Sequence, residues 1–153
     1  MPKNRAFIDT SVILRFLVKD DDLKAKAVEK LLRTASVRGT VLHILPVTML
    51  EIVWVLEKVY KFGRKEIREL AEAIINTPKL KVEMGDVFLK ALKVYEEKNV
   101  KFADAVMGYW GLEKGIAIAY TYDEKDFRRI EGLTVKKPQR SGTDLPGVTN
   151  AFA

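Results

Sequence analysis

Acidic side chains stand at four places where the chain leaves an apolar run or enters the first turn of an expected helix: Asp9, Glu51, Asp104 and Asp123. Three of these acids come shortly after runs that have the composition of buried strands. The carboxyl ends of parallel strands meet at one edge of a sheet. Asp9, Glu51 and Asp123 should therefore emerge together if the strands are parallel. Asp104 opens the expected helix before the run 116–121, and the sequence constrains its placement less.

Carboxylates that converge in this way repel one another. At about 6 Å and an effective dielectric constant near 20, each pair costs about 2–3 kcal/mol. A fold keeps such a cluster only if protons or cations relieve the repulsion. Oxygen ligands without histidine or cysteine suit Mg²⁺ or Mn²⁺ better than zinc. These ions generate hydroxide and stabilise in-line displacement at a phosphodiester, so the acids predict metal-assisted hydrolysis.

The composition removes several other chemistries. The 153 residues include no cysteine, which excludes disulfide scaffolds, thiolate metal sites and cysteine nucleophiles. The single histidine, His43, lies inside an apolar run, where a buried structural role is expected rather than a catalytic one. Neither a P-loop nor a G-x-G-x-x-G motif occurs. A net charge of +6 permits an anionic partner, and the absence of cysteine fits a reducing, cytoplasmic compartment.

Each acid, taken alone, also fits a structural role at the start of a helix. Aspartate is a common N-cap, and acids in the first turn interact favourably with the helix dipole. Thr48 and Glu51 have the spacing of a capping box. Asp104 in a first turn and Asp123 before a helix need no other explanation singly. Only the convergence of all four acids favours a metal site over caps.

Apolar runs alternate with helical periodicity along the chain, which predicts one α/β domain with a mainly parallel sheet. The expected strands are 5–9, 41–45, 80–82, 116–121 and 133–135. The expected helices begin at Thr10 and at Asp20–Asp22, and further helices are expected at 48–60, 64–75, 85–98, 102–114 and 123–130. The domain is expected to span residues 1–137, with 138–153 as a C-terminal tail without periodicity.

Four short motifs, in their order and spacing, resemble the PIN domain, a Mg²⁺-dependent ribonuclease fold. They are Phe7-Ile8-Asp9-Thr10-Ser11-Val12-Ile13, Thr48-Met49-Leu50-Glu51, Phe102-Ala103-Asp104-Ala105, and Tyr120–Phe127 continued by Ile130–Leu133. The resemblance covers Ala6 to about Pro138 and implies a three-layer α/β/α fold around a mainly parallel central sheet. The size and single-domain organisation further resemble the toxins of VapBC-type toxin–antitoxin pairs. That resemblance implies a homodimer, an antitoxin partner and internal cleavage of RNA.

On this basis we expect Asp9, Asp104 and Asp123 to bind Mg²⁺ or Mn²⁺, directly or through water. Glu51 would bind metal or orient the attacking water. Three hydroxyl residues could orient the carboxylates or touch a phosphate, or could equally act as helix caps: Thr10, Ser11 and Thr121. Asp126 either assists a metal through water or belongs only to its short helix, and we favour the assisting role.

Basic residues on the helices that start at the expected site could hold the RNA backbone: Arg15, Lys19, Lys125, Arg128 and Arg129. For any one of them, a solvated surface position is the simpler explanation. Trp54, Tyr109 and Trp110 lie at helical spacing with apolar residues, which favours packing in the core or a subunit interface over base stacking. Gly108 and Gly111 would let another element approach their helix closely.

Two other functions fit parts of the sequence. In a non-catalytic nucleic-acid-binding or scaffold module, the acids would be caps only, and RNA binding would not respond to EDTA. A metal-dependent phosphohydrolase of small phosphate esters would use similar acids. Phosphatases with a nucleophilic aspartate normally carry D-x-D after the first strand, whereas Thr10 and Ser11 follow Asp9 here.

Overall fold

The computed structural model describes residues 4–139 and is a mixed α/β structure. Its strands are β1 (Asn4–Phe7), β2 (Thr40–Ile44), β3 (Leu80–Val82), β4 (Ile118–Tyr120) and β5 (Thr134–Lys136). Its helices are α1 (Thr10–Val18), α2 (Asp22–Arg38), α3 (Pro46–Lys58), α4 (Arg64–Ile75), α5 (Gly85–Glu97), α6 (Phe102–Glu113) and α7 (Glu124–Phe127). The predicted α/β class is confirmed. The predicted tail lies, from residue 140 onward, outside the described residues.

All strand pairs are parallel, but the strands form two sheets rather than the single central sheet that the sequence predicts. β1, β2 and β3 form one sheet in that order, and β4 pairs with β5 in a second. Phe7 lies opposite His43 at the end of β1, and Tyr120 lies opposite Lys136 at the end of β4. Within residues 4–139, β1 and β4 are therefore both edge strands.

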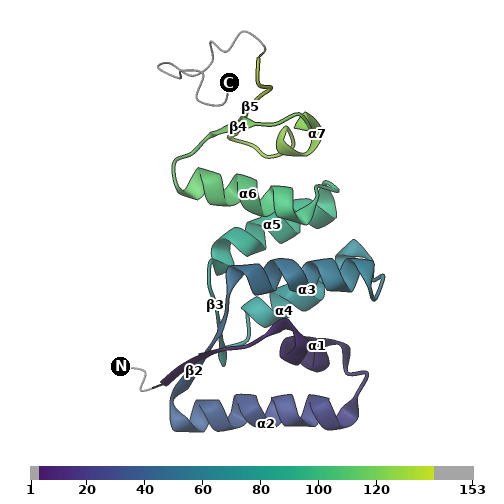
Figure 1. Ribbon diagram of the computed structural model, residues 1–153, viewed down its shortest axis with the longest axis vertical. Helices are drawn as coiled ribbons and strands as arrows, with labels where there is room; N and C mark the ends of the chain where they lie inside the picture. Colours follow the sequence, from purple (N-terminus) through teal and green to yellow (C-terminus); the bar gives the residue numbers. More distant parts are fainter. Residues whose placement is uncertain (1–3, 140–153) are drawn as a thin grey trace, which may run out of the picture.

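The elements are stacked along one long axis (Figure 1). The strands β1 and β2 run between α2 on one side and α3 and α4 on the other. The helices α5 and α6 follow, and β4, α7 and β5 lie together beyond α6. The two sheets are thus separated along the axis by helices.

The core lies among the helices and the inner strand β2. Its largest buried aromatic residues are Phe88, Tyr95 and Phe102. The rings of Tyr95 and Phe102 meet edge to face with centroids 5.7 Å apart, a favoured aromatic geometry. Arg64 covers the Tyr95 ring at 4.2 Å and donates hydrogen bonds of 2.8 Å to the carbonyl oxygens of Tyr95 and Val100. These contacts fix the turn that leads into α6, the helix that carries Asp104.

Glycines let the C-terminal elements approach α6 closely, as predicted. A Cβ atom at Gly108 would lie 2.5 Å from Cδ1 of Ile130, and one at Gly111 would lie 3.0 Å from the carbonyl oxygen of Ile116. Ile130 is only 2% exposed. The segment from β4 to β5, which carries Asp123, is therefore packed against α6 of the same chain.

Two boundary differences have local causes. α3 begins at Pro46 rather than at Thr48, since proline is favoured at the first helical position. α7 is a single turn, and the chain continues in tight turns in which the amides of Arg129 and Ile130 bond to the carbonyls three residues earlier. Only half of the predicted helix 123–130 is thus α-helical.

The predicted structural role of His43 is confirmed. The ring is 5% exposed, Arg5 Nε donates to its Nε2 at 3.2 Å, and its Nδ1 lies 2.7 Å from Glu83 Oε1. Of the two packing roles predicted for the aromatic residues, core packing does not hold for Trp54 and Trp110, which are 58% and 42% exposed, and a subunit interface stays a prediction. Tyr109 is half-buried against the core. Within the described part of the chain, no helix is long and apolar enough to cross a membrane.

Candidate active site

Asp9 stands alone between β1 and α1 and acts as the N-cap of that helix. Its Oδ2 accepts hydrogen bonds from the Ser11 amide at 3.1 Å and the Ser11 hydroxyl at 2.5 Å. These bonds stabilise the charged form, so the Ser11 hydroxyl and amide lower the pKa of Asp9. The carboxylate is nevertheless exposed to solvent. Asp9 therefore combines a capping role with an ionised oxygen that is open to a ligand.

The other three predicted acids make no side-chain capping hydrogen bond. Glu51 lies in the second turn of α3, where Leu45 is the N-cap, so the capping box with Thr48 is wrong. The N-cap of α6 is Lys101, which makes no side-chain capping bond. Asp123 is the N-cap of α7 without a side-chain bond to that helix. Asp104 does lie in the first turn of α6, where an acid interacts favourably with the helix dipole, so only the side-chain capping role is removed.

Asp104, Asp123 and Asp126 form an acidic cluster at the N-terminus of α6. The pKa of Asp104 is raised chiefly by its partial burial, then by the negative charge of Asp126 and a hydrogen bond to it. Asp123 raises the pKa further, and the Lys101 ammonium opposes the shift. Lys101 Nζ lies 3.6 Å from Asp123 Oδ2. The cluster therefore carries more negative charge than Lys101 compensates.

Asp126 also has a structural role. It is 6% exposed, and its Oδ2 accepts a 3.0 Å hydrogen bond from the amide of Lys101. This bond ties α7 to the start of α6. Thr121 orients the loop beside it, because its hydroxyl accepts from the Asp123 amide at 2.9 Å. The same hydroxyl donates to the Asp123 carbonyl at 3.1 Å.

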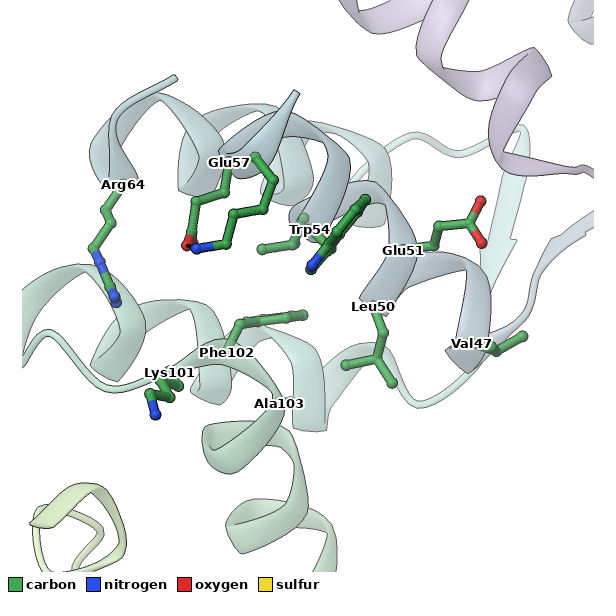
Figure 2. A pocket seen from close by; sticks show the side chains of 11 residues that line it. Val47, Leu50, Glu51, Trp54, Glu57, Arg64, Lys101, Phe102 and Ala103 are labelled. Carbon is green, nitrogen blue, oxygen red and sulfur yellow. Dashed lines mark ion pairs between the residues drawn. The ribbon is translucent and has the colours of Figure 1, made fainter. Parts of the chain in front are cut away.

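A cavity of about 580 Å³ separates α3 from the start of α6 (Figure 2). Its lining is apolar around Leu50, Trp54 and Phe102, and it is charged toward Glu57 and Arg64. Glu51 belongs to the lining, but Figure 2 shows its carboxylate turned away from that charged end. α3 thus places Glu51 at the rim of the cavity, with its carboxylate directed away from the start of α6.

The four acids predicted to converge are divided between two places. Asp104 and Asp123 come together, whereas Asp9 lies at the end of β1, in the other sheet. Residues 4–139 contain no group of three or more histidine, cysteine or acidic side chains close enough to hold a metal ion. The division follows from the split sheet, since Asp9 and Asp123 would share an edge only if β1 and β4 shared a sheet.

The predicted RNA-binding residues differ in how many contacts their side chains already make within the protein. Arg15 pairs with Asp20 at 3.0 Å, and Arg128 pairs with Glu124 in its own helix. Arg129 donates to the carbonyl oxygen of Lys98 and so has a structural partner. Lys19 lies over the ring of Phe16, with its Nζ 5.9 Å from the centroid. Lys125 is exposed.

Sequence reasoning missed Lys101, which contacts two members of the acidic cluster. Its ammonium faces Asp123 and its amide binds Asp126. The available signal was its position directly before the helix that Asp104 opens. A basic residue there is unfavourable for the helix dipole, and such a conflict indicates a local partner of opposite charge.

Asp104→Asn should raise the melting temperature of the metal-free protein at neutral pH. The pKa of Asp104 is higher in the folded than in the unfolded protein. At a pH above the unfolded pKa, ionisation of Asp104 therefore destabilises the folded state, and asparagine, which does not ionise, removes this destabilisation. Solvent screening limits the gain to less than about 1 kcal/mol, or roughly 2–4 °C. The gain should disappear as the pH falls below the unfolded pKa.

A matched control is Asp86→Asn, an exposed acid in the first turn of α5. It should not gain stability, because it loses only a favourable interaction with the helix dipole. Melting curves in EDTA from pH 3 to 8 measure both variants. Equal loss of stability in the two variants at neutral pH would contradict the crowding of acids around Asp104.

Comparison with known families gives a single assignment for nearly all of the described chain. Residues 6–133 match the PIN domain family. The chain belongs to the PIN domain family. Within it, a protein named VapC ribonuclease from Aquifex aeolicus (strain VF5) is 27% identical over 134 residues. The match spans 88% of this PIN-domain chain and 98% of that relative.

Proposed function

We propose that this PIN-domain protein is a metal-dependent endoribonuclease, the toxin of a toxin–antitoxin pair. The observation that carries the proposal is the cluster of Asp104 and Asp123, which make no side-chain capping hydrogen bond and crowd negative charge at one point. Membership of the PIN domain family and the similarity to a VapC ribonuclease support the choice of RNA as substrate.

The donor chemistry of the proposed site fits Mg²⁺ or Mn²⁺. Asp9, Asp104 and Asp123 offer only carboxylate oxygens, which hard divalent cations prefer. Burial and the nearby charges of Asp126 and Asp123 raise the pKa of Asp104, so a bound cation would favour its charged form. When bound, the ion would supply an activated water and stabilise charge at the phosphate. Glu51 would bind the metal or orient the attacking water.

The protein's own residues would hold the RNA and the carboxylates in place. Ser11 keeps Asp9 ionised and fixes its rotamer by two hydrogen bonds. Lys19 and Lys125 are the stronger candidates for phosphate contacts, and Arg15 and Arg128 would exchange an exposed ion pair for phosphate at little cost. Arg129 is the weakest candidate, because it already binds a backbone carbonyl.

An antitoxin would inhibit by neutralising the same acids. An arginine or lysine of the partner that enters beside Asp104 and Asp123 would replace the charge of the metal through charge-assisted hydrogen bonds. The cavity between α3 and α6 adjoins this point through Ala103 and Glu51. A toxin of this kind would act in the cytoplasm, where its RNA substrates are.

The test is cleavage of a structured RNA labelled at its 5′ end. With Mg²⁺ or Mn²⁺, purified protein should produce internal fragments, and EDTA should abolish them while a later addition of Mn²⁺ restores them. A non-catalytic binding module would instead retain the RNA equally in EDTA and Mn²⁺ without fragments. A phosphohydrolase of small esters would hydrolyse p-nitrophenyl phosphate and leave the RNA intact.

A further inference from the structure

In the described chain, β1 and β4 are edge strands, although their sequences include apolar residues typical of strands inside a sheet. β1 pairs only with β2 and β4 only with β5 within residues 4–139. Exposed apolar side chains lie at the C-terminal end of β1, where Phe7 is 69% exposed, and on β4, where Ile118 is 50% exposed. The run 116–120 is Ile-Ala-Ile-Ala-Tyr, and such continuous apolar runs are typical of parallel strands covered on both faces.

The outer edges of the two sheets have a different character. β3 carries Lys81 and follows Lys79, and β5 ends in Lys136 beside Lys137. Lysine on an edge strand opposes pairing with another chain, and natural sheets use it in this way. The charged residue of β1, Arg5, instead donates to His43 of its paired strand β2, and β4 carries no charged residue. The charge pattern therefore favours β3 and β5 as the outer edges and β1 and β4 as strands that require a neighbour.

The chain's own β4 does not reach its own β1. Figure 1 shows α3, α5 and α6 at levels between β1 and β4 along the long axis. Ile130 and Leu133 pack over Gly108 and hold the β4–α7–β5 unit on α6. A second copy can offer its β1 to this β4 without breaking that packing. The reverse pairing follows by two-fold symmetry and leaves neither copy with an open apolar edge.

We propose that two copies of this chain exchange their C-terminal units, so that β4 of each copy adds in parallel to β1 of the other. Each resulting sheet has the order β3–β2–β1–β4–β5, with its lysine-bearing strands outside. Parallel strands end at one edge of their sheet, so Asp9 of one copy lies beside Asp123 and Asp104 of the other. Each active site is then composite and is incomplete in a single chain.

This inference rests on the proposed function for its catalytic consequence, which subunit complementation measures. Asp9→Asn and Asp123→Asn should each be inactive alone. After the two variants are unfolded together and refolded as a mixture, random pairing should restore about one quarter of the wild-type activity, because half of the dimers hold one intact site of two. If each site were built from one chain, the mixture would remain inactive, and the proposal would be overturned.

Cross-linking tests the exchange without any activity. Since the chain has no cysteine, Phe7→Cys and Tyr120→Cys introduce single thiols at the ends of β1 and β4. A mixture of the two variants treated with a short bismaleimide should give a covalent dimer on a denaturing gel. A mixture of Leu23→Cys and Tyr120→Cys should not, because Leu23 is an exposed residue at the start of α2, a helix outside both sheets.

The double variant Phe7→Cys/Tyr120→Cys distinguishes exchange between two copies from pairing of β4 with β1 of the same chain. Exchange predicts dimers that are cross-linked between chains, whereas closure of β4 on its own β1 gives a cross-linked monomer and overturns the proposal. Absence of any cross-link overturns it as well. If the cysteine variants form cross-linked dimers but the wild-type protein cuts no RNA, the exchange is supported and the nuclease function is rejected, so the two failures are distinguishable.

Discussion

Asp9→Asn and Asp123→Asn should each reduce cleavage of RNA by about 100-fold or more. Asparagine keeps the size of the side chain but removes the charge that holds a divalent cation. A bound ion supplies several kcal/mol of transition-state stabilisation, and each 1.36 kcal/mol corresponds to about a tenfold change in rate. Initial rates on a labelled RNA in Mn²⁺ measure the effect for each purified variant.

Folding should be preserved in both variants, which makes the loss interpretable. Asparagine is nearly as good an N-cap as aspartate, so α1 keeps its start when Asp9 is replaced. Asp123 loses only an exposed ion pair with Lys101, which is worth little. The control is Asp86→Asn on α5, which should cut RNA normally. Undiminished cleavage by both site variants would indicate a contaminating nuclease and reject these acids as the site.

Local chemistry made most helices predictable. The boundary between α2 and β2 follows from Gly39, which caps the helix in a left-handed conformation with φ of 71°. Asp21 caps the other end by accepting from the amide of Lys24. Pro46 carried a further signal that the prediction did not use, because proline at the first helical position moves the start of α3 ahead of Thr48.

The association of the strands could not be predicted in the same way. Alternating strands and helices predict parallel pairing, but periodicity does not say which edge joins which, or whether both edges belong to one chain. The run 116–120 predicts a buried strand, yet Ile118 is half exposed in the described chain. Because β4 does not pair with β1 in the described chain, Ile118 stays half exposed and Asp123 lies apart from Asp9.

Candidate acids can be chosen from the sequence, but their geometry cannot. Residue type alone excludes most other chemistry, and the position of the acids after strands and at helix starts makes them candidates. The electrostatics of the cluster depend on contacts far apart in the sequence, such as the bond from the Lys101 amide to Asp126, 25 residues away. Exposure of Trp54 also depends on what covers α3, which helical periodicity cannot tell.

Gly108→Val should lower the stability of the protein by about 2–3 kcal/mol, a fall in melting temperature of roughly 4–12 °C. A Cβ at this position would lie 2.5 Å from Ile130 Cδ1 and 3.1 Å from Leu133 Cδ1. Both neighbours lie on the segment that follows α7, so relief of the clash must push that segment away from α6. Calorimetry measures the shift against Ala73→Val, an exposed helical position of α4.

A double-mutant cycle with Ile130→Val identifies the cause of the loss. Valine at 130 lacks the Cδ1 methyl that the new side chain would meet, so Gly108→Val/Ile130→Val should lose less stability than the sum of the single variants. Additive losses would mean that Gly108 is needed for another reason, such as backbone freedom. Because this contact holds Asp123 on the helix that carries Asp104, Gly108→Val should also weaken any Mn²⁺-induced rise in melting temperature. The Ala73→Val control should keep that rise.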